Sequence, residues 1–265
     1  MKKSASGTKK KSQDNFATPA QEQEGLARKA NDTIIRDRKS SVEYDQRARE
    51  TNWLGPEIVF KLAYEYVKPG ESVLDLGIGS GLSSILFHKV GLKVYGLDGS
   101  SEILEVCESK CFAIELKQHD LRSVPLPYPS GFFDHVISVA VLNFFRDLAP
   151  LFEETARIIK DEGIFAFTVE EQKSDQDDRY EINRVNVSEK PKAETAVTLF
   201  RHNDDYIAKL LDDSGFIQLK SLEFLAFKYP AENKDVFFKA YIVQSERIPI
   251  NLKFSSRLYK WHIKA

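Results

Sequence analysis

The chain has 265 residues, of which 42% are hydrophobic and 29% charged, a composition that suits one globular domain. No apolar run approaches the roughly 20 residues of a transmembrane helix, and the basic start lacks the apolar stretch of a signal peptide, so we expect a cytoplasmic protein without a membrane span. The only two cysteines, Cys107 and Cys111, exclude a disulfide framework. They have no His or third Cys at ligand spacing, so no metal site is predicted.

The formal net charge of −2 is unevenly distributed along the chain. Residues 1–40 carry ten Lys/Arg against five Asp/Glu, and residues 247–265 carry five Lys/Arg and no acid. Residues 41–246 therefore have a net charge of −12, which is poorly matched to nucleic-acid phosphates and disfavours such a partner. We predict a disordered basic N-terminal tail over 1–40, a folded domain over 41–246 and a basic C-terminal extension over 247–265.

Within the folded part, short apolar segments alternate with segments of helical periodicity. The predicted strands, in chain order, are residues 72–77, 93–98, 112–120, 132–142 and 163–171. The predicted helices between them are residues 82–90, 101–110 and 148–160. Strands that alternate with helices form βαβ units, so we expect an α/β fold with a parallel sheet and helices on both faces.

The pattern changes after the fifth predicted strand. Residues 172–201 are too long and too polar for an ordinary connection, so we interpret them as an insertion, either a lid over a pocket or a surface loop. A helix is predicted over 204–216, ending at Ser214-Gly215. Strands over 219–230 and 236–246 are expected to pair as an antiparallel hairpin at the edge of the sheet.

A glycine-rich loop follows the first strand in the segment VLDLGIGSGLSS, which spans residues 73–84. Glycine permits backbone angles closed to other residues and lets a ligand approach the main chain. In an open parallel sheet this loop lies beyond the carboxyl end of the strand, where ligands bind. The loop residues expected at the ligand are Gly77, Ile78, Gly79 and Gly81.

Acidic residues near this loop bear on the class of cofactor. A dinucleotide-binding turn requires a small residue where this chain has Leu82, and Asp75 suits an ammonium group better than a pyrophosphate. Asp98 closes the second strand. A carboxylate there accepts hydrogen bonds from both hydroxyls of a ribose, in a dinucleotide as well as in a cofactor with an amino-acid end, or it caps the next helix. Asp120 ends the third strand, near the expected position of an adenine amino group.

These segments together resemble the motifs of the class I S-adenosylmethionine (SAM)-dependent methyltransferases. The resemblance covers about residues 41–246 and is carried by VLDLGIGSG, GLDGS, HDL and FDHVISVAVLNFF. It implies a Rossmann-like seven-stranded sheet, mostly parallel with a reversed last strand, and SAM as cofactor. Within the family, the chain is most similar to small-molecule enzymes with the Williams-Beuren-region methyltransferase-like pattern.

The resemblance also implies a role for each motif residue. Asp75 would help to hold the methionine amino group, and the backbone at Gly77 and Gly79 would border the methionine portion. Asp98 would bind the ribose and Asp120 the adenine. The other implied contacts are Gly99 and Ser100 beside the ribose, Leu121 beside the adenine, Val139 beneath the methionine end, and Tyr44 and Trp53 closing over the cofactor.

The acceptor is less constrained by the sequence. Transfer requires mainly an acceptor atom about 3–3.5 Å from the methyl carbon, in line with the sulfur. His202 is the candidate general base, because His135 lies within a strand and is expected to pack in the core. The Pro-Pro motif of amine-methylating enzymes is absent at VLNFF, where Asn143 lies, so we expect a small organic acceptor. An NAD-dependent oxidoreductase and a non-catalytic SAM-binding protein remain as alternatives.

Overall fold

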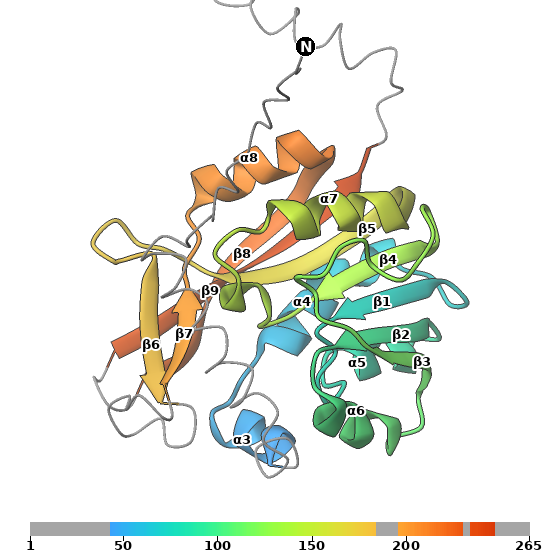
Figure 1. Ribbon diagram of the computed structural model, residues 1–265, viewed down its shortest axis with the longest axis horizontal. Helices are drawn as coiled ribbons and strands as arrows, with labels where there is room; N and C mark the ends of the chain where they lie inside the picture. Colours follow the sequence, from blue (N-terminus) through green and yellow to red (C-terminus); the bar gives the residue numbers. More distant parts are fainter. Residues whose placement is uncertain (1–42, 184–195, 230–233, 247–265) are drawn as a thin grey trace, which may run out of the picture.

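The computed structural model describes residues 43–183, 196–229 and 234–246, and a seven-stranded sheet forms the centre of this part of the chain (Figure 1). The strand order is β3-β2-β1-β4-β5-β9-β8. The five strands from β3 to β5 are parallel, and β9 runs antiparallel to both of its neighbours. The predicted Rossmann-like sheet, mostly parallel with a reversed last strand, is therefore confirmed.

The strands of this sheet are β1 (Ser72–Leu76), β2 (Lys93–Asp98), β3 (Ala113–Gln118), β4 (Phe133–Ser138), β5 (Ile159–Glu170), β8 (Phe216–Tyr229) and β9 (Lys234–Ser245). The described helices are α3 (Tyr44–Glu50), α4 (Gly55–Ala63), α5 (Ser84–Lys89), α6 (Ser101–Glu108), α7 (Ala149–Ile158) and α8 (Asp204–Ser214), with short 3₁₀ turns η1 (Tyr64–Tyr66) and η2 (Leu142–Phe144). None of these helices has both the length and the apolar composition that crossing a bilayer requires.

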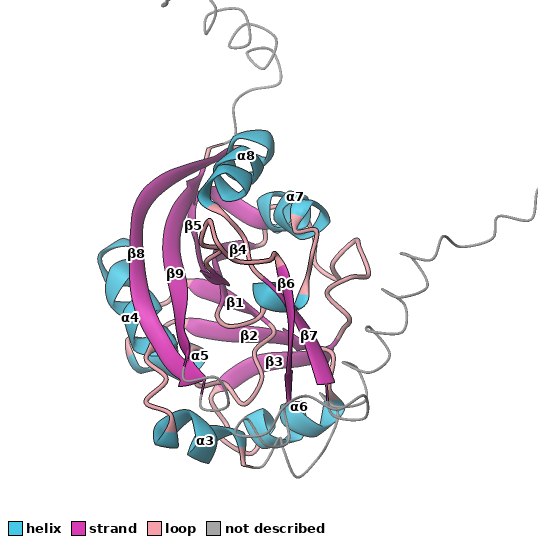
Figure 2. Cartoon of the chain, turned by 90° about the vertical axis from the view of Figure 1, so that its left-hand side faces the viewer, coloured by secondary structure: helices cyan, strands magenta, loops and turns pink. Residues whose placement is uncertain are grey.

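Helices cover both faces of the sheet, and each face has its own apolar core (Figure 2). Residues of α7 and α8, such as Phe152 and Leu211, pack on one face, whereas Val59 of α4, Phe87 of α5 and Cys107 of α6 pack on the other. Burial of these apolar side chains holds the helices against the strands. The three-layer arrangement leaves the carboxyl ends of the parallel strands open for a site.

Side chains of β1 alternate between the two cores. Leu74 and Leu76 lie in the core under α7 and α8, and Val73 lies in the core under α4 and α5. Since successive side chains of a strand point to opposite faces, Asp75 shares the face of Val73. This alternation decides what Asp75 contacts.

Three predictions of local structure need correction. The strand predicted over 132–142 ends at Ser138, and Leu142 begins the 3₁₀ turn η2. The helix predicted to extend to residue 160 ends at Ile158, because Ile159 pairs with Phe133 of β4 and begins β5. The described parts of the insertion, for which no strand was predicted, contain β6 (Arg179–Asn183) and β7 (Ala196–Phe200), which form an antiparallel two-stranded sheet. Residues 184–195 of the insertion and both predicted basic ends, 1–40 and 247–265, lie outside the described residues.

Candidate active site

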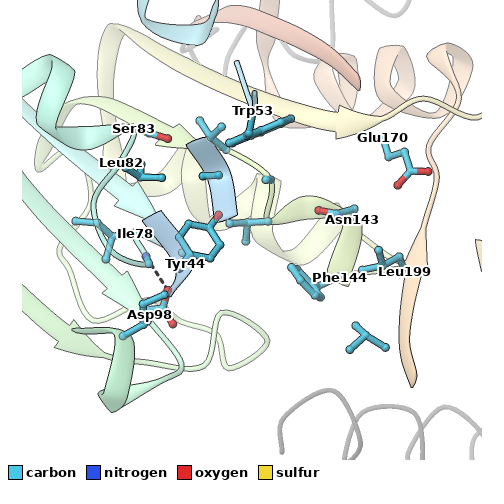
Figure 3. Close-up of a pocket in the computed structure, with 18 of the residues that line it drawn as sticks. Tyr44, Trp53, Ile78, Leu82, Ser83, Asp98, Asn143, Phe144, Glu170 and Leu199 are labelled. Carbon is cyan, nitrogen blue, oxygen red and sulfur yellow. Dashed lines mark hydrogen bonds between the residues drawn. The ribbon is translucent and has the colours of Figure 1, made fainter. Parts of the chain in front are cut away.

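A cavity of about 440 Å³ lies at the carboxyl ends of the parallel strands (Figure 3). Its wall includes residues that directly follow β1, β2 and β4, and the last residue of β5. β1 lies between β2 and β4 at this point, so the connections lead off in opposite directions and leave a crevice, as expected of an open α/β sheet. Predicted site residues in the wall are Tyr44, Trp53, Gly77, Ile78, Gly79, Asp98, Gly99, Asp120, Leu121 and Val139.

The glycines of the loop after β1 serve different purposes. Gly77 and Gly79 line the cavity with φ of 76° and 55°, and a Cβ on Gly77 would lie 2.5 Å from Val141. Gly81, with φ of 85°, is not among the lining residues, and a Cβ there would lie 2.5 Å from the ring of Phe112. The first two glycines therefore shape the cavity, whereas Gly81 permits close packing of the loop against the start of β3.

Asp98 is held in place by two backbone amides. Its Oδ2 accepts from the N–H of Gly79 at 2.9 Å, and its Oδ1 accepts from the N–H of Ser100 at 3.0 Å. Ser100 itself is fully buried and caps α6 by accepting from the N–H of Ile103, so the capping role falls to Ser100 and not to Asp98. The Asp98 carboxylate is thus fixed at the cavity wall, at the position that the resemblance predicts for a ribose.

Asp75 lies behind the cavity wall. Its side chain is 2% exposed, is not among the lining residues, and accepts a hydrogen bond from the hydroxyl of Ser84 on α5. Burial raises the pKa of Asp75 to about 7; the Ser84 hydrogen bond opposes this shift and the nearby charge of Asp98 adds to it. The structure therefore places Asp75 next to the glycine loop but not in contact with the cavity.

The raised pKa of Asp75 predicts that Asp75→Asn stabilises the ligand-free protein more at high pH than at low pH. In the unfolded chain the carboxyl ionises near its ordinary value of 3.8, but in the folded protein it ionises only near 7. The wild type should therefore lose stability relative to the Asn variant as pH rises from about 4 to about 7, by about 4 kcal/mol or about 8–16 °C in melting temperature, and no further above about pH 8. Melting curves of both proteins across this range test it; a difference in melting temperature that is independent of pH would contradict it.

The residues after β3 form the end of the cavity beyond Asp98. Asp120 and Leu121 both line it, and the Asp120 carboxylate accepts from the backbone N–H and the Nε of Arg122, at 3.0 and 2.8 Å. Leu121 is buried in the core under α7. This end offers one apolar side chain and one acidic group at the position predicted for an adenine.

The N-terminal helix α3 contributes another side of the cavity. Tyr44, at its first position, lines the cavity together with Asp98 (Figure 3). The neighbouring Asp45 accepts from the hydroxyl of Ser80 in the glycine loop and pairs with Lys110 at 2.5 Å. Lys110 also donates to the carbonyl of Ser80 at 2.7 Å. The helix is therefore fastened directly to the loop that it adjoins.

Trp53 lies in the wall between α3 and α4. Its ring packs edge-on against Phe238 of β9, with centroids 5.3 Å apart, and contacts Phe224 of β8. A Cβ on Gly55 would lie 2.1 Å from the Trp53 ring, so glycine there is what lets the indole reach this position. Trp53 thus links the N-terminal segment to the end of the antiparallel strands.

Sequence reasoning offered the insertion as a lid over a pocket, and Tyr180 and Ile182 of the insertion do line the cavity, but it did not identify the lining residues after β4 or those of β7. Val197 and Leu199 of β7 are buried and pack against Phe144 of η2. The alternation of apolar residues in AVTLF was a signal for this strand. The lining residues of this half are Asn143, Phe144, Phe145, Glu170, Tyr180, Ile182, Val197, Leu199, Phe227 and Phe238.

A buried ion pair fastens the two-stranded sheet to β5. Glu170, the last residue of β5, is 2% exposed, and its Oε1 accepts from the Nε of Arg201 at 2.8 Å. The hydroxyl of Tyr180 donates to the other oxygen of Glu170, and the guanidinium of Arg201 lies 3.8 Å from the centre of the Tyr180 ring. Three residues from β5, β6 and the end of β7 therefore form one polar cluster at the cavity wall.

His202 does not lie at the cavity wall. It is 5% exposed, is not among the lining residues, and its Nε2 lies 3.3 Å from the carbonyl oxygen of Leu142. Burial lowers the pKa of His202, with the carbonyls of Leu142 and Phe145 opposing the shift. His135 is also buried, with Nε2 2.8 Å from Glu71 and Nδ1 accepting from the N–H of Ile164. Both histidines have structural contacts.

Comparison with known proteins relates the central strands of the sheet to methyltransferases. Residues 74–167 match the family model of a methyltransferase domain. The chain is 38% identical over 103 residues to a demethylmenaquinone methyltransferase of Bacillus mycoides, a match over 37% of this chain and 44% of the relative. It is 28% identical over 145 residues to a malonyl-[acyl-carrier protein] O-methyltransferase of Serratia marcescens, a match over 52% of this chain and 55% of the relative. The chain spans 41 to 44% of the length of the demethylmenaquinone methyltransferases that it matches.

Solved structures share the fold. A SAM-dependent methyltransferase from Methanosarcina mazei superposes with a TM-score of 0.59 at 17% identity, covering 69% of this chain and 96% of the other. Magnesium protoporphyrin IX methyltransferase from Synechocystis PCC 6803, with bound S-adenosylhomocysteine (SAH), superposes with a TM-score of 0.57 at 16% identity, covering 82% and 100%. The family model and these likenesses agree: residues 74–167 match a methyltransferase domain, and the described sheet has the fold of SAM-dependent methyltransferases.

Proposed function

We propose that this chain transfers a methyl group from SAM to a small organic acceptor bound in the same cavity. The observation that carries the proposal is the carboxylate of Asp98, fixed by two backbone N–H groups beside the glycine loop. A carboxylate oxygen can accept more than one hydrogen bond, so Asp98 can bind both ribose hydroxyls while it keeps these contacts.

The rest of the cavity wall fits SAM as well. Gly77, where a Cβ would meet Val141, lets the glycine loop lie against the residues after β4 at the position expected for the methionine portion, and Asp120 and Leu121 offer polar and apolar contacts to an adenine. Bound SAM would supply an electrophilic methyl group on its sulfonium sulfur. The residues of this chain would then act chiefly by holding the two molecules in line and excluding water.

The acceptor would bind in the half of the cavity between η2, the β6–β7 sheet and the ends of β8 and β9. This half adjoins the glycine loop at Gly77, because Val141 lies where a Cβ on Gly77 would be. The named activities of the relatives, on demethylmenaquinone, malonyl-acyl carrier protein and magnesium protoporphyrin IX, concern acceptors other than nucleic acid. By analogy with these relatives, we propose that the acceptor of this chain is a small molecule. The similarity to the Williams-Beuren-region methyltransferase-like pattern stays a prediction.

A titration and a transfer assay test the proposal together. Calorimetric titration with SAM, SAH and NAD should give binding of the first two and none of NAD, because Leu82 occupies the place of the small residue that a dinucleotide turn requires. Incubation with methyl-labelled SAM and a panel of phenols, acids, amines and thiols should then give SAH and a labelled product. Binding of NAD alone would favour the oxidoreductase, and SAM binding without transfer to any acceptor would favour a non-catalytic binding protein.

A further inference from the structure

Asn143 of η2 presents an unused hydrogen-bond acceptor in the acceptor half of the cavity. The residue is 6% exposed and lines the cavity, and its Oδ1 is buried without a hydrogen-bond partner among the described residues. In the close-up, the oxygen end of Asn143 is turned toward the side of the cavity where Tyr44 and Trp53 lie (Figure 3). Buried polar atoms in native proteins almost always have a partner, so an unsatisfied one in a cavity wall calls for a ligand group.

The charged residue that the structure describes in the acceptor half, where Asn143 lies, is already paired with an opposite charge. Of the described residues that line the cavity, the charged ones are Asp98, Asp120, Arg122 and Glu170. Asp98 and the Asp120–Arg122 pair lie at the carboxyl ends of β2 and β3, on the side assigned to SAM. Glu170 lies in the acceptor half, where it is paired with the buried guanidinium of Arg201. A charged acceptor would therefore lose its hydration without gaining an opposite charge.

The remaining surface of the acceptor half is apolar and partly aromatic. Phe144, Val197 and Leu199 face it from one side, and Phe227 and Phe238 lie at the ends of the antiparallel strands. Such a surface stabilises apolar rings and chains by removing them from water. The other polar lining residues described in this half, Tyr180 and Glu170, are already bonded to each other, so the Asn143 amide is the polar group left for an acceptor.

We propose that the acceptor is an uncharged, largely apolar molecule that donates one hydrogen bond, from an O–H or N–H group, to Oδ1 of Asn143. This inference rests on the proposed function, because it assigns the ligand of the acceptor half. Asn143 is then a positioning and specificity-determining residue. It fixes the orientation of an otherwise apolar molecule, and it selects against analogues that lack the donor, since these would leave the buried oxygen unpaired.

The experiment uses the full chain loaded with SAH and four naphthalenes that differ in one substituent. These are 1-naphthol (an uncharged donor), 1-methoxynaphthalene (no donor), 1-naphthoate (an anion) and 1-naphthylmethylammonium (a cation). At pH 7, binding measured by calorimetry should be about tenfold tighter for 1-naphthol than for each of the others, as expected of one buried hydrogen bond. The same ranking would support the proposal whether or not naphthol is itself methylated.

Variants of Asn143 locate the preference. In Asn143→Leu, 1-naphthol should bind no more tightly than 1-methoxynaphthalene, while SAH affinity stays within twofold of wild type. Asn143→Ala provides the same comparison if the Leu variant does not fold. Gln218→Leu, which removes an exposed amide on β8, is the matched control and should keep the naphthol preference.

The outcomes separate the two proposals. If wild type binds no SAH, the proposed function fails. If SAH binds but the anion or cation binds more tightly than naphthol, if naphthol does not bind, or if Asn143→Leu keeps the naphthol preference, only the assignment of the acceptor class is overturned.

Discussion

The Asp98→Ala variant should bind SAH at least a hundredfold more weakly than the wild type. Replacement by alanine removes the two charge-assisted hydrogen bonds to the ribose that the proposed function assigns to this carboxylate, each worth about 1.5–3 kcal/mol. It also releases the N–H groups of Gly79 and Ser100, which the carboxylate holds at 2.9 and 3.0 Å, so the glycine loop loses an anchor at the same time. The two effects act on the same half of the cavity.

Calorimetric titration of SAH into the Asp98→Ala variant measures this loss, with circular dichroism as the check that the fold is intact. Asp213→Ala, which removes an exposed carboxylate on α8, is the matched control and should bind SAH as the wild type does. Asp98→Asn, which keeps one acceptor oxygen, should fall between wild type and the Ala variant. SAH affinity of Asp98→Ala within threefold of wild type would refute the role assigned to this carboxylate.

Arg201→Met should lower the free energy of unfolding by about 3–5 kcal/mol, because it leaves the carboxylate of Glu170 buried without a counter-charge. In a domain of this size, that corresponds to a fall of about 6–20 °C in melting temperature. Tyr180 still donates to Glu170 in this variant, but a hydroxyl does not neutralise the charge.

A second substitution distinguishes the lost charge balance from lost packing. In the double variant Arg201→Met with Glu170→Gln, no buried charge remains, so most of the stability should return. Lys209→Met breaks an exposed pair with Asp213 on α8 and should cost less than about 1 kcal/mol. Equal melting temperatures for the single and double Arg201 variants would show that the ion pair is not what the protein needs at this position.

The sequence predicted the parallel strands and the loop after β1, because both depend on local patterns. Short buried strands give continuous apolar runs, and the bends at Gly77 and Gly79 require φ values that glycine adopts without strain. The position of Asp98 could be predicted in the same way. It ends the strand that neighbours β1, and the carboxyl ends of neighbouring parallel strands lie at the same edge of the sheet as the glycine loop.

The position of Asp75 could not be predicted from its proximity to the glycines. The twofold alternation of β1 puts its side chain on the face covered by α5, where Ser84 donates to it. The lining residues of the acceptor half were harder to identify for a different reason. Glu170 and Arg201 are 31 residues apart, and several described side chains between them, such as those of Ser174 and Glu181, face solvent. Only the folded chain shows that Val197 and Leu199 turn inward against η2.

The attachment of α3 to the glycine loop has a kinetic consequence. Lys110 and Asp45 must separate whenever α3 moves away from the cavity, and their side chains are 24% and 22% exposed, so dissolved ions reach this pair and weaken it. Rising ionic strength should therefore speed the exchange of spent for fresh cofactor. In an enzyme limited by product departure, moderate salt then accelerates turnover, although the same salt leaves the alignment of the reacting atoms unchanged.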